Sequence, residues 1–183
     1  GCSTHSQRVR SAREHFYGNR LVEANRALEE HLESHPEDAD ATALDLAIVQ
    51  LLDGRPAEAE ATLRQVRDNL DHYDQTDAVE LGMSMLTDDQ RLAYAGTDYE
   101  KVLTRVFLSL ASLMHDGQDA EAYSLQINAK QEQLLQRAVS DEVEDAAQTY
   151  TPLAIGPYLH GVLRESSFGN YDDAARAYHQ VVS

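Results

Sequence analysis

The sequence is poor in cysteine and in basic residues, and each shortage excludes a class of protein. Its single cysteine, Cys2, can form neither an internal disulfide nor a cysteine-rich zinc site. Its 15 Lys and Arg stand against 32 Asp and Glu, which gives a formal net charge of −17. Such a field repels both the phosphates of nucleic acids and the headgroups of anionic membranes. We therefore expect no nucleic-acid binding and no membrane binding through basic patches.

Long apolar runs, strand patterns and catalytic motifs are also missing. No stretch approaches the roughly 20 apolar residues that a membrane-spanning helix needs, so membrane attachment has to be covalent or through a partner. We find no nucleophile elbow, phosphate-binding loop or dinucleotide fingerprint. Adjacent acids such as Asp172 and Asp173 point in different directions on a helix, and helix capping explains them. We therefore expect no enzymatic activity and no cofactor.

What the sequence does contain is a recurrent helical pattern. Its 183 residues, 42% of them hydrophobic, suffice for one domain with a core. Glycine or asparagine interrupts the helical periodicity at spaced positions, which are Gly18-Asn19, Gly54, Gly117 and Gly169-Asn170. The segments that follow are "RLVEANRAL", "RPAEAEATL", "QDAEAYSLQI" and "YDDAARAYHQV". Each has a small residue where two helices can approach closely, and these equivalent positions are Ala24, Ala59, Ala122 and Ala174.

This pattern resembles the tetratricopeptide-repeat family. A period in the mid-thirties, built from a helix, a glycine turn and a second helix, is typical of that family, and Ala24 and Ala59 are 59 − 24 = 35 residues apart. The resemblance implies an all-α fold, a right-handed superhelix of antiparallel hairpins, in a single domain over 1–183. We expect hairpins at about 5–36, 40–71, 99–150 and 152–183, an insertion at about 73–98 and one long helix at about 119–150. Pro36 is expected to end the second helix of the first hairpin.

Two of the expected first helices are apolar almost all the way round: "ATALDLAIVQLL" and "VLTRVFLSLASLM". In tetratricopeptide arrays the first helix of each hairpin lines a concave groove that holds peptides. Because a helix of this kind is buried on more than one side, we expect residues from about 73–96, or the long helix, to fill the groove. The alternative is an open apolar groove for a partner's helix, a small ligand or a lipid. It predicts a pocket lined by Leu44, Ile48, Phe107 and Leu108.

The stretch "SMLTDDQRLAYAGTDYEKVL" carries a second, narrower resemblance. It is similar to a segment of an uncharacterised family of bacterial tetratricopeptide lipoproteins, and the match falls on Asp88, Asp89, Tyr94, Gly96, Tyr99 and Glu100. The resemblance implies a cell-envelope location and no assigned chemistry. The candidate partner-binding residues are Arg91, Tyr94, Gly96, Tyr99 and Glu100. The structural alternative is that the acids cap helices and the tyrosines pack at the rim of the core.

Cys2 is the candidate lipid-attachment residue. A lone cysteine at the start of the polar segment "GCSTHS" resembles the first residue of a mature bacterial lipoprotein, which receives lipid when its signal peptide is removed. The alternative is an accidental surface cysteine. The lipoprotein interpretation predicts anchoring in the cell envelope, on the periplasmic side of the outer membrane if the host is Gram-negative, through the lipid alone.

His31 and His35 are a weak candidate for a metal site. They are four residues apart in "EEHLESH", so that both imidazoles lie on one helix face within reach of a single zinc ion. No Glu follows the first His, as metalloprotease chemistry requires. Two histidines at a helix C-terminus are also explained by their favourable interaction with the helix dipole. We therefore expect no metal.

These observations together predict a non-enzymatic scaffold or adaptor for protein–protein interaction. Its partner would be another envelope protein of unknown identity, bound through the acidic surface or around Tyr94–Glu100. The alternative is a small-ligand or lipid-binding protein that uses the apolar first helices.

Overall fold

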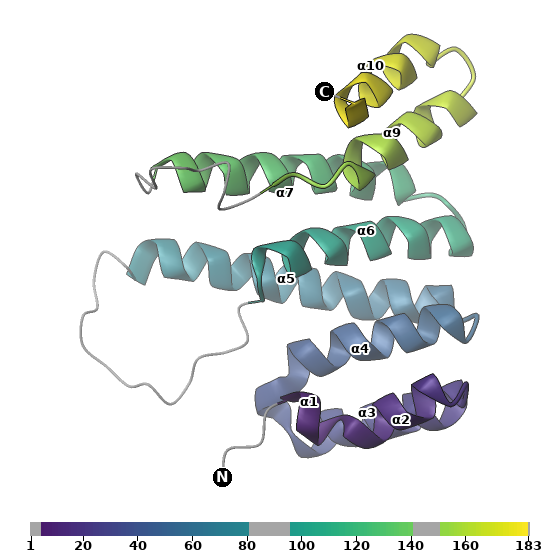
Figure 1. Ribbon diagram of the computed structural model, residues 1–183, viewed down its shortest axis with the longest axis vertical. Helices are drawn as coiled ribbons and strands as arrows, with labels where there is room; N and C mark the ends of the chain where they lie inside the picture. The colour runs from purple at the N-terminus through teal and green to yellow at the C-terminus, as the bar shows by residue number, and fades with distance from the viewer. Residues whose placement is uncertain (1–4, 81–95, 141–150, 183) are drawn as a thin grey trace. The chain divides into compact units, whose positions relative to one another are not determined.

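The computed structural model describes residues 5–80, 96–140 and 151–182, and every regular element in these ranges is helical (Figure 1). The all-α prediction is therefore confirmed. By its contacts the chain divides into two compact units, Gly1–Thr97 and Asp98–Ser183. None of the described helices is long and apolar enough to cross a membrane. Cys2 lies outside the described residues.

The first unit is built from helices that pack on their neighbours in sequence. They are α1 (His5–Arg8), α2 (Arg10–Tyr17), α3 (Leu21–Ser34), the 3-10 helix η1 (Pro36–Asp38), α4 (Ala39–Leu52) and α5 (Pro56–Glu80). The helix α2 packs on α3, α3 on α4, and α4 on α5. The core that α2, α3 and α4 share contains Val9, Ala12, Ala24, Leu28, Leu46 and Val49. The prediction that Pro36 ends a helix is confirmed, because α3 stops at Ser34.

In the part of the second unit that the structure describes, four helices repeat this arrangement. They are α6 (Asp98–His115), α7 (Ala120–Ser140), α9 (Ile155–Ser166) and α10 (Tyr171–Val182). The helix α6 packs on α7, α7 on α9, and α9 on α10. Their core contains Val102, Val106, Ile127, Leu134 and Leu159. The side-chain amide of Gln131 on α7 donates to the backbone oxygen of Leu153 and accepts from its nitrogen, which fixes the chain just before α9.

The turns between paired helices fall where the sequence predicts them. Asn19, Gly54, Gly117 and Gly169 have φ of 55°, 75°, 73° and 88°. Left-handed backbone of this kind ends a helix at little cost when glycine or asparagine occupies the position. At the first turn Asn19 takes the left-handed conformation, whereas Gly18 has φ of −80°.

The predicted equivalence of the four alanines holds at three positions and is wrong at the fourth. Ala24, Ala59 and Ala174 are buried, but Ala122 is exposed. The helices α3, α5 and α10 begin two residues after their turn residue, whereas α7 begins three residues after Gly117. This extra residue rotates α7 relative to the pattern, so that Ala120 and Tyr123 take the buried positions instead.

Several predicted boundaries differ from the observed helices. The helix α5 continues to Glu80 and therefore includes the first residues of the predicted insertion, while 81–95 lie outside the described residues. The predicted long helix is observed as α7 over Ala120–Ser140, and 141–150 are likewise outside them. That residues 73–96 fill a groove stays a prediction. Within the first unit α4 packs between α3 and α5.

Tyr178 joins the last two helices. Its hydroxyl on α10 donates a hydrogen bond of 2.7 Å to Glu165 Oε2 on α9. This hydrogen bond, with smaller contributions from burial and from the Glu165 charge, raises the pKa of Tyr178 to about 12. Because the pKa is raised, the stabilisation from this pair is complete below the usual tyrosine pKa of 10.0 and is lost as the pH rises through about 12.

Candidate functional site

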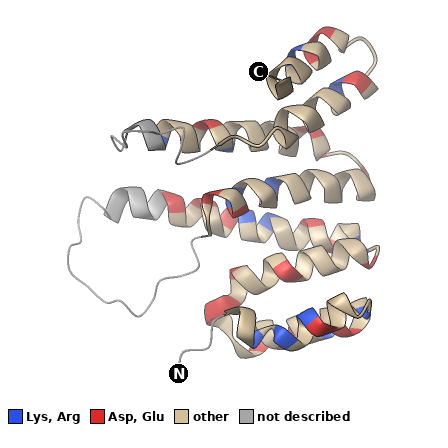
Figure 2. Cartoon of the chain, viewed as in Figure 1, with Lys and Arg blue, Asp and Glu red and all other residues tan. Residues whose placement is uncertain are grey.

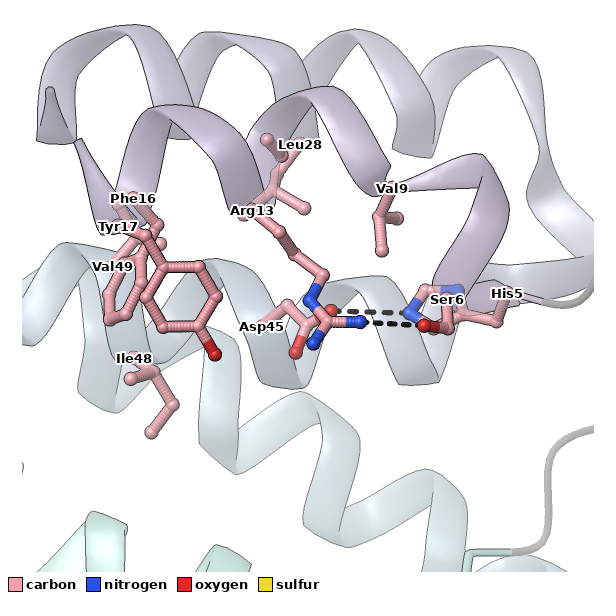
Figure 3. A pocket seen from close by; sticks show the side chains of 11 residues that line it. His5, Ser6, Val9, Arg13, Phe16, Tyr17, Leu28, Asp45, Ile48 and Val49 are labelled. Carbon is pink, nitrogen blue, oxygen red and sulfur yellow. Dashed lines mark hydrogen bonds and ion pairs between the residues drawn. The ribbon is translucent and has the colours of Figure 1, made fainter.

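A pocket of about 360 Å³ lies in the first unit between the N-terminal helices and α4 (Figure 3). Its apolar end is formed by Phe16 and Tyr17 on α2 and by Ile48 and Val49 on α4. Tyr17 is 77% exposed, so its ring stands at the rim. The wall is completed by Val9, Ala12 and Leu28, which also belong to the core. The apolar end is therefore shaped by the packing of α2 and α3 against α4.

The other end of the pocket is polar. His5 Nε2 lies 3.2 Å from Asp45 Oδ2, and Arg13 Nη1 donates a hydrogen bond of 2.6 Å to Ser6 Oγ. His5 and Ser6 come from the short helix α1, Arg13 from α2 and Asp45 from α4. The pocket thus offers an apolar surface beside donors and acceptors of both charges, which is the lining typical of binding sites.

The pocket differs from the one that the open-groove alternative predicts. Ile48 lines it, but Leu44, Phe107 and Leu108 do not. Leu108 is fully buried on α6. Aromatic residues at the end of α2 form the apolar end instead, and the pair "FY" just before Gly18 was the available sequence signal.

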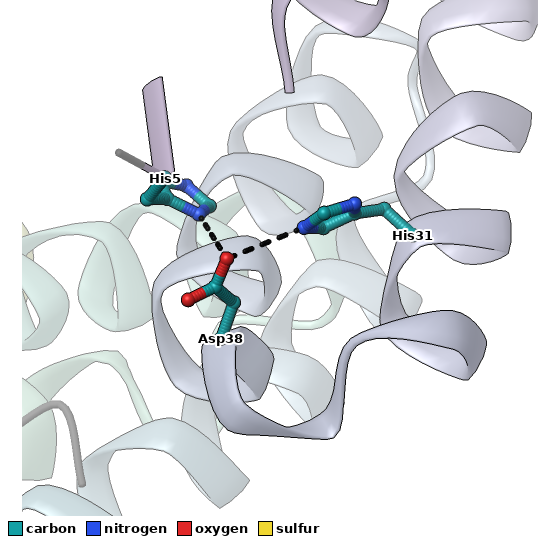
Figure 4. Close-up of side chains that lie close together, drawn as sticks. All are labelled: His5, His31 and Asp38. Carbon is teal, nitrogen blue, oxygen red and sulfur yellow. Dashed lines mark ion pairs between the residues drawn. The ribbon is translucent and has the colours of Figure 1, made fainter. Parts of the chain in front are cut away.

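Behind the polar end, three ionisable side chains meet: His5 from α1, His31 from α3 and Asp38 from η1 (Figure 4). One donor atom from each lies within 4.8 Å of the other two. Asp38 Oδ2 is 3.5 Å from His5 Nδ1 and 3.5 Å from His31 Nε2. The other carboxylate oxygen, Asp38 Oδ1, accepts a hydrogen bond of 2.6 Å from Arg8 Nη2.

The three atoms that face one another in this cluster are buried without a hydrogen bond among the described residues. They are His5 Nδ1, His31 Nε2 and Asp38 Oδ2. The residues His31 and Asp38 are 8% and 9% exposed. Charge-assisted hydrogen bonds measure about 2.7–2.9 Å, so a separation of 3.5 Å is an ion-pair distance only. A buried polar atom left in this state costs roughly 1–3 kcal/mol.

The charge of Asp38 is maintained by its surroundings. Burial raises the pKa of the Asp38 carboxyl, but the hydrogen bond from Arg8, the neighbouring His5 and His31 and the Arg8 charge together hold that pKa below its usual value. Asp38 is therefore a carboxylate at neutral pH, and its unshared oxygen faces two imidazoles.

Only one histidine of the predicted pair belongs to this cluster. The rings of His31 and His35 stack with centroids 4.3 Å apart. His35 Nδ1 lies 2.9 Å from Ser34 Oγ, however, and the group of potential ligands contains His31 but not His35. His5 and Asp38 were missed by sequence reasoning, because only the tertiary fold brings them to His31.

The candidate partner-binding residues are only partly described. Arg91 and Tyr94 lie outside the described residues, as does Asp88. Gly96 has φ of 68° and stands two residues before the start of α6. Tyr99 is 42% exposed on the first turn of α6, and Glu100 is half-buried. Thr104 Oγ1 donates a hydrogen bond to the backbone oxygen of Glu100.

Comparisons with protein-family models, with curated proteins and with solved structures find no match to this chain.

Proposed function

We propose that the chain is a non-catalytic adaptor whose helical hairpins form a tetratricopeptide-like array, and that its N-terminal pocket receives a side chain of a partner protein. The observation that carries the proposal is the position of the pocket between α2 and α4. These are the first helices of two successive hairpins. In tetratricopeptide arrays the first helix of each hairpin lines the peptide-binding groove.

The order of the elements supports the array. Helices pair as α2 with α3, α4 with α5, α6 with α7 and α9 with α10, each pair joined by a turn with a left-handed residue. Small buried residues stand at corresponding places in three of the second helices. These are the local features that the repeat pattern requires.

The lining of the pocket defines the chemistry of the segment that it would bind. Phe16, Tyr17 and Ile48 suit an apolar or aromatic side chain, and Arg13 and Asp45 suit the backbone or a polar neighbour of that side chain. Acidic and basic residues are interspersed along α2, α3 and α5, whereas α4 carries acidic residues only (Figure 2).

Site-specific photo-crosslinking in cells tests this proposal. A benzophenone amino acid replaces Tyr17 at the rim of the pocket, Tyr99 in the predicted binding segment, or Tyr171, which is 59% exposed on α10. We expect a protein adduct from position 17 that position 171 does not give. An adduct from position 99 would support the predicted role of the segment before α6. No adduct from position 17, or the same adducts from 17 and 171, would remove the pocket from the interface.

A matched pair of substitutions on α4 strengthens the test. Ile48→Arg places a long charged chain in the pocket, whereas Leu52→Arg adds the same group one turn further along the helix, where Leu52 is 60% exposed and does not line the pocket. We expect Ile48→Arg to reduce the adduct from position 17 at least about tenfold, because a tenfold loss of affinity requires only about 1.4 kcal/mol. Leu52→Arg should leave it unchanged. Circular dichroism of both variants serves as the control for folding.

A small ligand is the second candidate for the pocket. Its volume of about 360 Å³ lies at the lower end of the range of about 300–1,000 Å³ for small-molecule sites. Under this alternative, position 17 gives no protein adduct, and a small molecule copurifies with the wild type and with Leu52→Arg but not with Ile48→Arg.

Lipid attachment at Cys2 and location in the cell envelope remain part of the proposal. They rest on the sequence resemblance alone. Metabolic labelling of the expressed precursor with an alkyne fatty acid tests them, and the label should disappear in Cys2→Ser. Equal labelling of both proteins, or of neither, would contradict lipidation of this residue.

A further inference from the structure

We propose that His5, His31 and Asp38 form a binding site for a divalent transition-metal ion of the zinc type, with His5 Nδ1, His31 Nε2 and Asp38 Oδ2 as its protein ligands (Figure 4). The site lies behind the polar end of the pocket, and it does not depend on the pocket's proposed function.

The separations between the donor atoms fit such an ion. Zinc is held at about 2.0–2.1 Å by imidazole nitrogen or carboxylate oxygen, so that neighbouring ligand atoms of a tetrahedral site are about 3.3–3.4 Å apart. Both nitrogen–oxygen separations in the cluster are 3.5 Å. The two nitrogens are within 4.8 Å of each other, and His5, which is only half-buried, has room to close the remaining difference.

In the neutral tautomer with its proton on Nε2, His5 leaves its inward nitrogen free to bind a metal. Asp45 can only accept a hydrogen bond, so the contact of 3.2 Å requires the proton of neutral His5 to be on Nε2. His5 Nδ1 then carries a lone pair and faces Asp38 Oδ2, which is also an acceptor. Two lone pairs that face each other repel unless a proton or a metal ion lies between them, and a metal ion would in addition reach His31 Nε2.

His31 provides independent evidence for the same position. Its side chain is more than nine-tenths buried, and its Nε2 points at Asp38 Oδ2 without a hydrogen-bond partner among the described residues. A buried imidazole nitrogen normally finds such a partner. A metal ion shared with Asp38 would satisfy both atoms at once.

The surrounding residues supply the outer contacts that metal sites use. Metal-bound histidines usually donate their second ring nitrogen to a carboxylate, as His5 Nε2 does to Asp45. Arg8 holds Asp38 Oδ1 and so leaves Oδ2 as the ligand. Two imidazoles and one carboxylate suit Zn²⁺ or Co²⁺ better than Ca²⁺ or Mg²⁺, which prefer all-oxygen ligands. A water molecule would complete a four-coordinate site.

The ion would connect three separate elements, α1, α3 and η1. The short helix α1 has no buried residue and is held by polar contacts, so metal binding would add a further attachment to the rest of the first unit. We therefore expect zinc to slow the hydrogen exchange of the Val9 amide, which donates to the backbone oxygen of His5 at the end of this helix, a readout that does not depend on a partner.

Calorimetric titration of the metal-stripped full chain with ZnCl₂ tests the site. We expect one ion per chain with a dissociation constant below about 1 µM. His5→Ala and Asp38→Asn should each weaken binding more than about 100-fold, and Asp45→Asn about 10–100-fold through the outer contact. Co²⁺ should give the visible absorption of a tetrahedral centre in the wild type and not in His5→Ala. Circular dichroism of each variant serves as the control for folding.

Two control substitutions test whether other residues bind the metal. His35→Ala removes the histidine that sequence spacing pairs with His31, and Cys2→Ser removes the only thiol. Both variants should bind zinc within a few-fold of the wild type. The assignment is overturned if the wild type binds no zinc below about 10 µM, if His5→Ala binds like the wild type, or if either control loses the ion.

Discussion

Replacing Leu28 by alanine is expected to destabilise the protein by about 2–5 kcal/mol, because the substitution leaves a cavity that the surrounding helices cannot fill. Leu28 is 2% exposed on α3 and belongs to the core that α2, α3 and α4 share. It also lines the pocket, so the loss enlarges the pocket from behind. Urea denaturation followed by circular dichroism measures the change in the free energy of unfolding.

Val22→Ala on the same helix is the matched control. Val22 is 69% exposed, and alanine is the better helix former, so the change should lie within about 0.5 kcal/mol of zero. Equal losses from the two substitutions would show that Leu28 does not occupy the core position assigned to it.

Gly161→Ala is expected to destabilise the hairpin of α9 and α10 by about 1–3 kcal/mol through overpacking. A Cβ atom at Gly161 would lie 2.5 Å from Tyr178 Cε1 and 2.6 Å from Cδ1, closer than carbon atoms tolerate. In a helix without this neighbour the same substitution stabilises by roughly 0.5–1 kcal/mol. The close contact should therefore reverse the usual sign, as thermal or urea denaturation can measure.

A double-mutant cycle with Tyr178→Ala isolates the cause. The three atoms nearest to the added methyl group all belong to Tyr178, so removal of the ring removes these closest contacts. Gly161→Ala should then become neutral or stabilising in the Tyr178→Ala background. If the loss persists there, its origin lies elsewhere in the helix.

Much of the local structure could be predicted from the sequence, because it depends on local backbone chemistry. Glycines such as Gly54 and Gly169 favour a helix end because they adopt left-handed backbone easily, and the structure has left-handed backbone at both. The error at Ala122 shows the limit of this reasoning. A single additional residue between Gly117 and α7 changes which helix face is buried, and the length of a turn is not visible in hydrophobic periodicity.

The candidate site was less predictable because it depends on tertiary contacts. The four-residue spacing of His31 and His35 is visible within one helix, whereas His5 and Asp38 reach His31 through a separate helix and through the chain reversal at Pro36. Asp38 could have been suspected from its position just after that proline. The approach of His5 could not have been suspected, since His5 lies 33 positions before Asp38 in the sequence.

The two ends of the pocket are held in place by different forces. Phe16 and Val49 are positioned by close packing, which changes little with ionic strength. His5 and Ser6 belong to a helix of only four residues, too short to persist alone, so their positions depend on charged contacts with Asp38, Asp45 and Arg13. Added electrolyte screens charged contacts that water reaches. We therefore expect the apolar end of the cavity to keep its shape as salt is added, and the positions of His5 and Ser6 at the charged end to change with the ionic strength.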